Sequence, residues 1–451
     1  MDPADLDHRA RTLSGIVPPT VVSRLLELGH EEEVERRARR GEWFCAREWA
    51  LVLGDRGRQE EALDVLAPYA ATGWWTAVRA QVELLEQWGR AEEAIAQVRP
   101  HARSGGFELE LLARLLARHG RLDEAVARLI PGIEDPGLAS TLVEVTEGAG
   151  RDEEIAPLLA ARIPVGHRCE DPWCCRGLDP DTAIGLLAAV RERQGRVDEA
   201  IALLHTRHIS SVNARDQLAD LLARQDRIEE LRAYADSDPH GHAARCLAEV
   251  LEERGDIDGA IAVYRQPDDS RADRVQAAVA LAGLLGRRHR GDEAIEVMRT
   301  LADSLGDPDD RVVDTLCTRY ADHGRAADGL AYLDALSARR GGREEWEFFV
   351  LRLRLMAARG LLDEGIGLTR AHPEGDTWSA AWTLSDLLAE SGRIQEAVAV
   401  LEAHGAAHPT LLAGHLIVLG RVEEALQLLQ RREPKRFVPL WSGTFEAEPT
   451  L

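Results

Sequence analysis

The sequence predicts an all-α solenoid of about 12–13 helix hairpins, and three observations carry this prediction. The chain of 451 residues is built largely from Ala, Leu, Arg and Glu, which are strong helix formers, while aromatic residues make up only 5%. A short motif recurs along the chain with a period typical of helix-hairpin solenoids. The segments between motif copies carry helical periodicity, and none shows the sustained alternation of a strand.

The motif reads Gly-Arg-x-[Asp/Glu]-Glu-Ala-[Ile/Leu/Val]. Successive copies begin 28 to 36 residues apart, except for one interval of 45 residues between Gly150 and Gly195. The six clearest copies begin at Gly57, Gly89, Gly120, Gly195, Gly392 and Gly420. Seven weaker copies begin at Gly29, Gly150, Asp226, Gly255, His289, Gly324 and Gly360.

Each part of the motif has a physical reason. An apolar stripe at helical spacing precedes the Gly, as in Leu109, Leu112 and Leu116. The Gly ends that helix because it tolerates the left-handed backbone of a C-cap. The acidic pair then lies in the first turn of the next helix, where carboxylates favour the positive end of the dipole. The motif Ala, with a second small residue twelve positions earlier, allows two helices to cross closely.

The period and the paired small residues resemble the tetratricopeptide repeat (TPR) family over roughly residues 27–432. This resemblance implies a right-handed superhelical α-solenoid whose first helices, the A helices, line its concave side. The aromatic positions of the family are mostly Leu or Ile in this chain. Sel1-like and pentatricopeptide arrays are therefore the alternative repeat classes.

The motif positions divide the chain into five segments. The N-terminal cap begins with a flexible stretch and ends in a first helix. The apolar C-terminal tail, with Phe437, Trp441 and Phe445, either covers the exposed end of the solenoid or docks on another chain. The segments are the cap 1–26, N-terminal repeats 27–165, a Cys/Pro-containing insertion 166–182, C-terminal repeats 183–432 and the tail 433–451.

Charge and composition restrict the partners and the compartment. The formal net charge of −23 repels phosphate backbones, so we expect no nucleic-acid partner. The first residues lack the basic and apolar regions of a secretory signal, and no apolar run is long enough to span a membrane. Six cysteines are too few for a disulfide scaffold. We therefore expect a cytoplasmic protein with reduced thiols and no membrane partner.

The insertion gathers residue types that bind zinc, namely His167, Cys169, Cys174 and Cys175. Their spacing is not that of two Cys-x-x-Cys knuckles, and adjacent cysteines rarely both ligate one ion. Three interpretations fit this segment: a zinc site, a redox or disulfide pair, and an ordered loop without chemistry.

No catalytic motif occurs in the sequence. There is no P-loop, dinucleotide-binding glycine pattern, nucleophile elbow or His-Glu-x-x-His, and the acidic pairs are explained by their place at helix starts. We therefore expect a protein without enzymatic activity and without a cofactor other than the zinc considered above.

The predicted function is that of a protein-interaction scaffold or regulator, which binds a peptide or partner protein in the concave groove. Arginines, carboxylates and aromatic residues at exposed A-helix positions suit a ligand held by ion pairs and apolar anchors. The alternatives are a solvated face with intrahelical pairs, a sensor of a peptide or metabolite, and an RNA-binding repeat array. The predicted groove residues are Phe44, Arg47, Trp74, Arg79, Glu83, Phe107, Glu110, Arg114, Arg245, Glu249, Arg354, Trp382 and Asp386.

Overall fold

The computed structural model confirms the all-α fold class. Within the described residues the chain forms 27 α-helices and one short 3-10 helix, and no strand. The described residues are 2–13, 15–102, 106–163, 177–207, 216–238, 241–265, 271–306, 308, 310–342, 344–404 and 409–430, without the side chains of 271–273.

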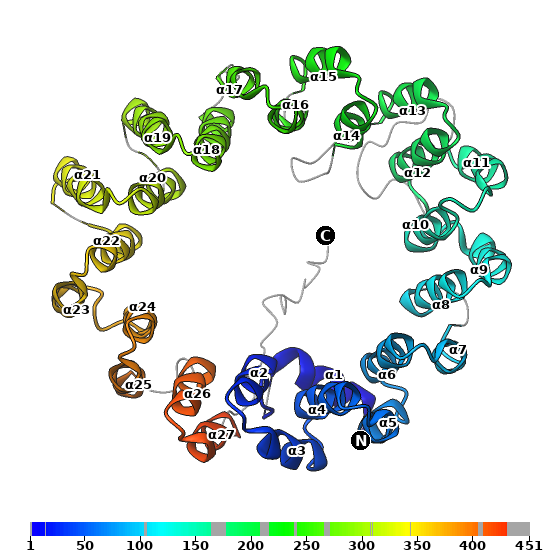
Figure 1. Cartoon of the computed structure of the whole chain (residues 1–451), viewed down its shortest axis with the longest axis horizontal. Helices are drawn as coiled ribbons and strands as arrows, with labels where there is room; N and C mark the ends of the chain where they lie inside the picture. The colour runs from blue at the N-terminus through cyan, green and yellow to red at the C-terminus, as the bar shows by residue number, and fades with distance from the viewer. Residues whose placement is uncertain are drawn as a thin grey trace, which may run out of the picture. The chain divides into compact units, whose positions relative to one another are not determined.

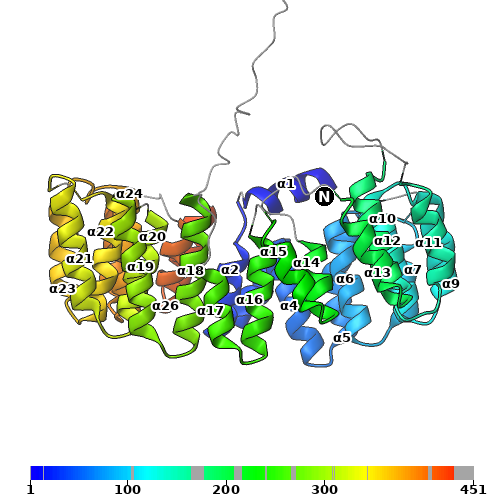
Figure 2. The ribbon, with the colours of Figure 1, turned by 90° about the horizontal axis from the view of Figure 1, so that it is seen from above.

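Helices α2 to α27 form thirteen successive hairpins, each with a copy of the motif at its turn. In each hairpin the even-numbered helix comes first and is the A helix, and the odd-numbered B helix returns beside it. The pair α18 and α19 shows this arrangement clearly (Figure 2). The predicted number of hairpins, about 12–13, agrees with this result.

The chain divides into two compact units. It leaves unit 1 after Val98 and returns to it at Thr369, so unit 1 contains both ends of the array. The helices that lie wholly in unit 1 are α1 (Pro3–Thr12), α2 (Pro19–Glu27), α3 (Glu31–Arg39), α4 (Trp43–Asp55), α5 (Gln59–Ala70), α6 (Trp75–Gln87), α7 (Ala91–Val98), α24 (Trp378–Glu390), α25 (Ile394–Ala403), α26 (Pro409–Val418) and α27 (Val422–Gln430).

Unit 2 spans Arg99–Leu368, and its A helices lie along the inner side of a curved stack, with the B helices outside (Figure 1). Its last helix, α23, extends three residues past the boundary. The helices are α8 (Phe107–Arg118), α9 (Leu122–Leu129), η1 (Ile130–Gly132), α10 (Pro136–Val145), α11 (Asp152–Ala160), α12 (Pro180–Arg193), α13 (Val197–Leu204), α14 (Gln217–Arg224), α15 (Ile228–Ala235), α16 (His242–Glu253), α17 (Ile257–Tyr264), α18 (Arg271–Arg287), α19 (Gly291–Leu305), α20 (Asp310–Asp322), α21 (Ala326–Arg339), α22 (Trp346–Ala358) and α23 (Leu362–Ala371).

The turn inside each hairpin has the left-handed backbone predicted for the motif Gly. Gly57, Gly120 and Gly420 have φ of 75°, 75° and 77°. Two weaker copies place a different residue there, and Asp226 and His289 still adopt φ of 60° and 58°. The geometry of the hairpin therefore imposes this conformation even on residues for which it is costly.

The small residues of the motif lie at the helix crossings. Ala125 and Ala200 are fully buried, as is Ala113 twelve positions before Ala125. On the same two B helices, Ala127 and Ala202 are exposed.

Replacing Ala125 or Ala200 by Phe should lower the free energy of unfolding by about 1 to 3 kcal/mol, because a bulky side chain overpacks the crossing. The matched changes Ala127→Phe and Ala202→Phe add the same side chain on the solvent side and should have little effect. Thermal melts of the four variants test this register. Equal melting temperatures for the buried and exposed variants would show that it is wrong.

The motif Arg forms a ladder of ion pairs along the array, which was not predicted from the sequence. Its guanidinium binds the carboxylate three residues later, in the first turn of the helix that the Arg precedes, as in Arg90–Glu93 at 2.7 Å. The same Arg also reaches the first acidic residue of the preceding copy, as in Arg90–Glu60 at 2.7 Å. Further pairs of this second kind include Arg151–Asp123, Arg227–Asp198, Arg290–Asp258 and Arg325–Asp292. The acidic pair therefore links neighbouring hairpins as well as favouring the start of its helix.

The N-terminal segment departs from the prediction of a flexible start. Residues 3–12 form helix α1, which begins at Pro3 with the Asp2 side chain accepting a hydrogen bond from the Ala4 amide. Leu6 is buried in the core of unit 1, and the Trp74 indole N–H donates to Asp7 at 3.4 Å. An Asp N-cap followed by Pro is a helix-start signal, and it accounts for this helix at residues predicted to be flexible.

The two ends of the array pack against each other within unit 1. Helix α26 of the last hairpin contacts α2 of the first, and buried residues of both hairpins belong to one hydrophobic cluster. Arg36 of α3 binds Glu423 of α27 at 3.3 Å. Glu423 is the first acidic residue of the last motif copy, so this pair continues the ladder; the first copy has His30 in place of the motif Arg. The first hairpin therefore covers the face that the last hairpin would expose.

Candidate partner-binding surface

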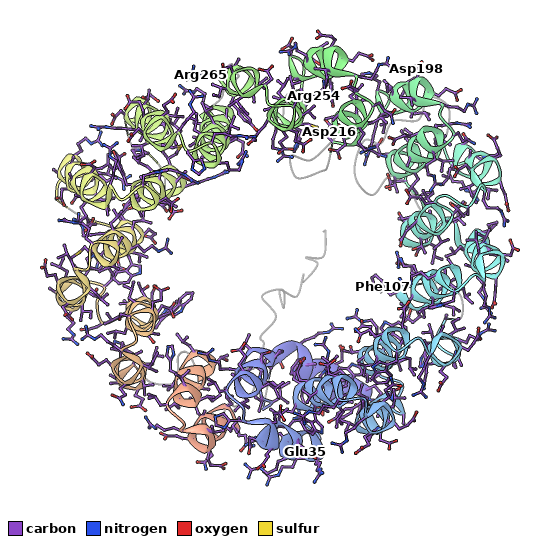
Figure 3. The ribbon with its side chains drawn as sticks, in the orientation of Figure 1. Glu35, Phe107, Asp198, Asp216, Arg254 and Arg265 are labelled. Atoms are coloured by element: carbon purple, nitrogen blue, oxygen red, sulfur yellow. The ribbon has the colours of Figure 1, made fainter. Side chains whose placement is uncertain are left out.

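Three aromatic side chains stand out from the described surface because they are large, apolar and exposed. Phe107 is 77% exposed, Trp378 57% and Trp382 45%. All three belong to A helices, at the first residue of α8 and α24 and one turn into α24. Phe107 points away from α8 on the inner side of unit 2, whereas Asp198 lies on the outer side (Figure 3). In each unit, the strongly exposed aromatic side chains among the described residues therefore lie on A helices.

In unit 1, Trp378, Trp382 and Asp386 follow one another at helical spacing along α24. Thr377 is the N-cap of this helix, and its hydroxyl accepts a hydrogen bond from the Ala380 amide at 3.2 Å. Residues 371–392 contain four acidic residues and no Lys or Arg. We name Trp378, Trp382, Asp386 and Glu390 the indole–acid face. This face combines two large apolar anchors with negative charge.

The predicted groove arginines of unit 1 pair with carboxylates on their own helices. Arg79 and Glu83 lie 3.2 Å apart with both side chains about half exposed, and Arg47 lies 3.6 Å from Glu48. Exposed pairs of this kind contribute only a few tenths of a kcal/mol. They can therefore exchange their partner for a ligand group at small cost in stability.

In unit 2 the predicted residues form two loose pairs and one tight cluster. Arg245–Glu249 at 4.0 Å and Arg354–Asp314 at 3.4 Å are exposed. Arg114 instead binds Glu110 at 3.2 Å and Glu144 at 2.9 Å, and donates to the buried Thr141 hydroxyl at 2.9 Å. Arg114 thus joins α8 to α10, and its replacement would disturb packing as well as any ligand contact.

Trp74 is a correction to the predicted groove. Trp74 is only 4% exposed, and its ring packs edge-on against the ring of Trp43, with 4.7 Å between the ring centroids. Trp43 packs in the same way against Tyr69, with 5.2 Å between centroids. Phe44 is also partly buried against the core of unit 1. Trp74 precedes α6 as its N-cap residue, so it turns inward under α1. Trp74 is a core residue and is not available to a partner.

The predicted zinc residues His167, Cys169, Cys174 and Cys175 lie outside the described residues. Among the side chains that the structure describes, no group of three or more His, Cys, Asp and Glu is arranged to hold a metal ion. Burial raises the pKa of the Cys246 and Cys317 thiols to about 11 and about 12, and it also raises that of Cys45. These three thiols are therefore protonated and poorly nucleophilic at neutral pH.

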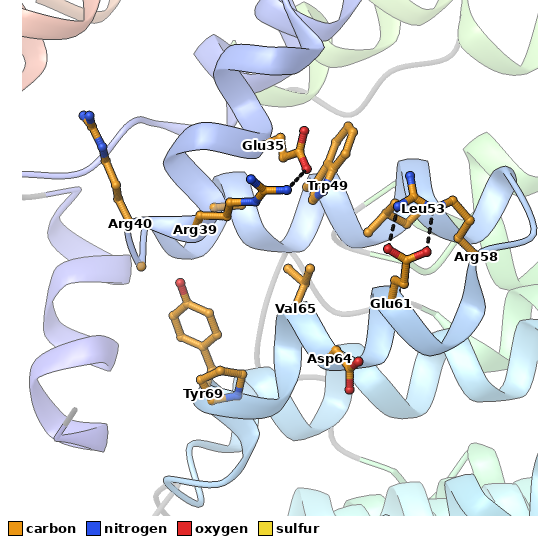
Figure 4. A pocket seen from close by; sticks show the side chains of 13 residues that line it. Glu35, Arg39, Arg40, Trp49, Leu53, Arg58, Glu61, Asp64, Val65 and Tyr69 are labelled. Carbon is orange, nitrogen blue, oxygen red and sulfur yellow. Dashed lines mark hydrogen bonds and ion pairs between the residues drawn. The ribbon is translucent and has the colours of Figure 1, made fainter.

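A cavity of about 570 Å³ lies on the other face of unit 1, between the B helices α3 and α5 with α4 as its floor (Figure 4). Trp49 and Leu53 form much of the floor. Two ion pairs line the rim, Arg39–Glu35 at 2.6 Å and Arg58–Glu61 at 2.5 Å. Because these charges satisfy one another, they do not converge on a common point in the cavity. The cavity therefore favours no single class of ligand.

Trp382 was among the groove residues predicted from the sequence, whereas Trp378 was not. A signal was present, because an aromatic residue stands nineteen positions before the small motif residue in several copies. Trp43 and Trp346 share this position, yet they are 3% and 7% exposed. The same sequence position is thus buried in two hairpins and exposed in a third, a difference that its residue type does not reveal.

No helix in the part of the chain that the structure describes has both the length and the apolar character needed to cross a membrane. This result agrees with the sequence, in which no long apolar run was found.

Comparison with known proteins does not place the chain in a family. No family model matches it, and no curated protein matches it. Among solved structures it is similar to one of Naa15/Naa10 bound to HypK-THB, with 13% identity, 91% of this chain and 73% of that chain covered, and a TM-score of 0.40. A likeness this weak carries no inference about function. The chain is a helical-hairpin repeat protein on the evidence of its own thirteen hairpins.

Proposed function

We propose that the protein is a TPR-like interaction scaffold that binds a peptide or partner protein on its A-helix face. The observation that carries this proposal is the exposure of Trp378, Trp382 and Phe107, all on A helices. Exposed apolar groups in soluble proteins mark interaction sites, and Trp is enriched among the residues that dominate binding energy. The proposal includes no enzymatic activity and no bound cofactor.

Exposed charges on other A helices of both units suit a ligand with both apolar and ionic groups. The pairs Arg79–Glu83, Arg245–Glu249 and Arg354–Asp314 are exposed and weakly held. Each can present either sign of charge to a partner. The thirteen motif copies and the buried small residues support the TPR-like class within the broader group of helical repeats.

Trp382→Arg should weaken partner binding at least about thirtyfold, since the loss of a central Trp anchor typically costs about 2 kcal/mol or more. The experiment captures partners with the full-length chain, identifies them by mass spectrometry and measures the affinity of a purified partner by calorimetry. Arg79→Glu, which breaks only an exposed pair, should weaken binding several-fold while leaving the melting curve unchanged.

The matched control is Leu368→Arg. Leu368 is 46% exposed, about as much as Trp382, but it lies on the B helix α23. It should leave binding unchanged. The proposal fails if Trp382→Arg and Leu368→Arg have equal effects, or if no protein is retained. Retention that nuclease treatment abolishes would favour the RNA-binding alternative, and retention of a small molecule alone would favour the sensor.

A further inference from the structure

Because the first hairpin packs against the last one, the C-terminal segment is not needed to cap the end of the array. In a stack of hairpins, the face beside the last A helix is normally open and needs a cap. Here α2 already lies beside α26, and Arg36 already binds Glu423. The place that a capping segment would take is therefore filled by residues from the start of the chain.

Residues 431–451 follow α27 directly and lie outside the described residues, but their sequence is unlike the rest of the chain. Four of the six residues 431–436 are basic, and they include Lys435, the single Lys of the protein. Phe437, Trp441 and Phe445 follow. The segment thus joins positive charge to aromatic groups, in a protein whose formal net charge is −23.

The indole–acid face has the complementary chemistry in the same unit. Trp378 and Trp382 offer exposed indole rings, and residues 371–392 are acidic without a single Lys or Arg. Cationic side chains are attracted both to carboxylates and to the faces of Trp rings. Among the described residues, no other helix presents two exposed Trp side chains.

The two segments are also within reach of each other. A B helix ends at the edge of the stack where A helices begin, so the chain leaves α27 at the edge that carries Trp378. Neighbouring packed helices lie about 8 to 10 Å apart, and α24 is one hairpin away from α26. A segment of 21 residues can extend about 70 Å.

We propose that residues 431–445 bind the indole–acid face of their own chain, so that a partner must displace them. The basic residues contact the acidic side chains of α24, and the aromatic residues pack on Trp378 and Trp382. The segment thereby acts as a built-in competitor. The competition rests on the proposed function, whereas the docking itself can be measured with the purified chain alone.

The test replaces Phe437 of the full-length protein by the photo-crosslinking residue benzoylphenylalanine and maps the crosslinks by mass spectrometry. We expect crosslinks to residues 374–390 of the same molecule. A mixture of nitrogen-15-labelled and unlabelled protein distinguishes crosslinks within one molecule from crosslinks between molecules, since the former join only segments with the same label. Crosslinks between molecules, to the cavity between α3 and α5, or to no site would overturn the proposal.

Variants test the chemistry of the contact. Trp382→Arg should lower the crosslink yield at least about fivefold through the loss of an aromatic anchor, and Trp378→Ser serves as the second variant if circular dichroism shows that the first misfolds. Leu368→Arg is the control and should not change the yield. Asp386→Arg should lower the yield, and combining it with Arg436→Glu should restore it. Unchanged yields in the Trp variants would exclude this face as the docking site.

Discussion

Arg37→Ala should lower the free energy of unfolding of unit 1 by about 3 to 5 kcal/mol, the largest effect that we expect from a charged residue. Arg37 is 1% exposed and donates to Glu33 at 2.9 Å and to Glu42 at 2.8 Å. Glu42 also accepts a hydrogen bond from the Val17 amide at 3.2 Å. Removing the guanidinium leaves the largely buried Glu42 without its cation and leaves Glu33 with Arg36 alone, at the point where α2, α3 and α4 meet.

The matched control for this prediction is Arg39→Ala. Arg39 pairs with Glu35 at 2.6 Å, also at i,i+4 spacing, but its side chain is 78% exposed. The control should cost at most about 0.5 kcal/mol. Urea denaturation followed by circular dichroism, with hydrogen exchange of α3 and α4 as the local measurement, compares the two. Equal effects would show that Arg37 is hydrated in solution.

The effect of Arg37→Ala should also depend on pH. Burial acts to raise the pKa of Glu33, but hydrogen bonds from Arg36 and Arg37 outweigh burial and hold that pKa below its ordinary value. A lowered carboxylate pKa adds stability above the pKa of the unfolded chain, about 4.3, and this stability is lost as pH falls through the folded pKa. The difference between the wild type and Arg37→Ala should therefore shrink below about pH 4.

Leu25→Ala, a substitution in the first hairpin, should increase local opening of the last hairpin. Leu25 is fully buried on α2, in the cluster that also holds Leu416 and Ile417 of α26. The cavity left by the missing side chain should cost about 2 to 5 kcal/mol. Hydrogen exchange in residues 409–430 should accelerate about thirtyfold or more, since each 1.4 kcal/mol is a factor of ten when local opening limits exchange.

The control for this prediction is Leu116→Ala in α8. Leu116 is as deeply buried as Leu25 but belongs to unit 2. It should destabilise its own surroundings to a similar degree and leave exchange in residues 409–430 unchanged. If Leu25→Ala also leaves the last hairpin unchanged, the two ends of the array are energetically independent.

The hairpins could be predicted from the sequence because their determinants are local. The left-handed Gly, the acidic first turn and the small Ala all act within one copy of the motif, so their spacing alone gave the helix order. The ion pairs within a helix follow from the same local spacing. Their second contacts, such as Arg90–Glu60, depend on how far each hairpin is offset from the next.

The candidate site was predicted only in part because exposure depends on neighbours that are distant in sequence. Trp382 and Phe107 are exposed as expected, whereas Trp74 is buried under α1, which was predicted as a flexible start. The junction between the chain ends was also missed. It joins α2 to α26 and includes the pair Arg36–Glu423, whose residues are 387 positions apart and carry no local signal of their pairing.

The packing of α2 beside α26 has a consequence for the order of the hairpins along the chain. Because α27 ends at the edge where α2 begins, a short linker between them would resemble the other connections of the array. A circular permutant that joins these ends and starts at another inter-hairpin loop would keep the contacts of the first and last hairpins. The contacts between the first and last hairpins therefore do not depend on which hairpin comes first in the chain.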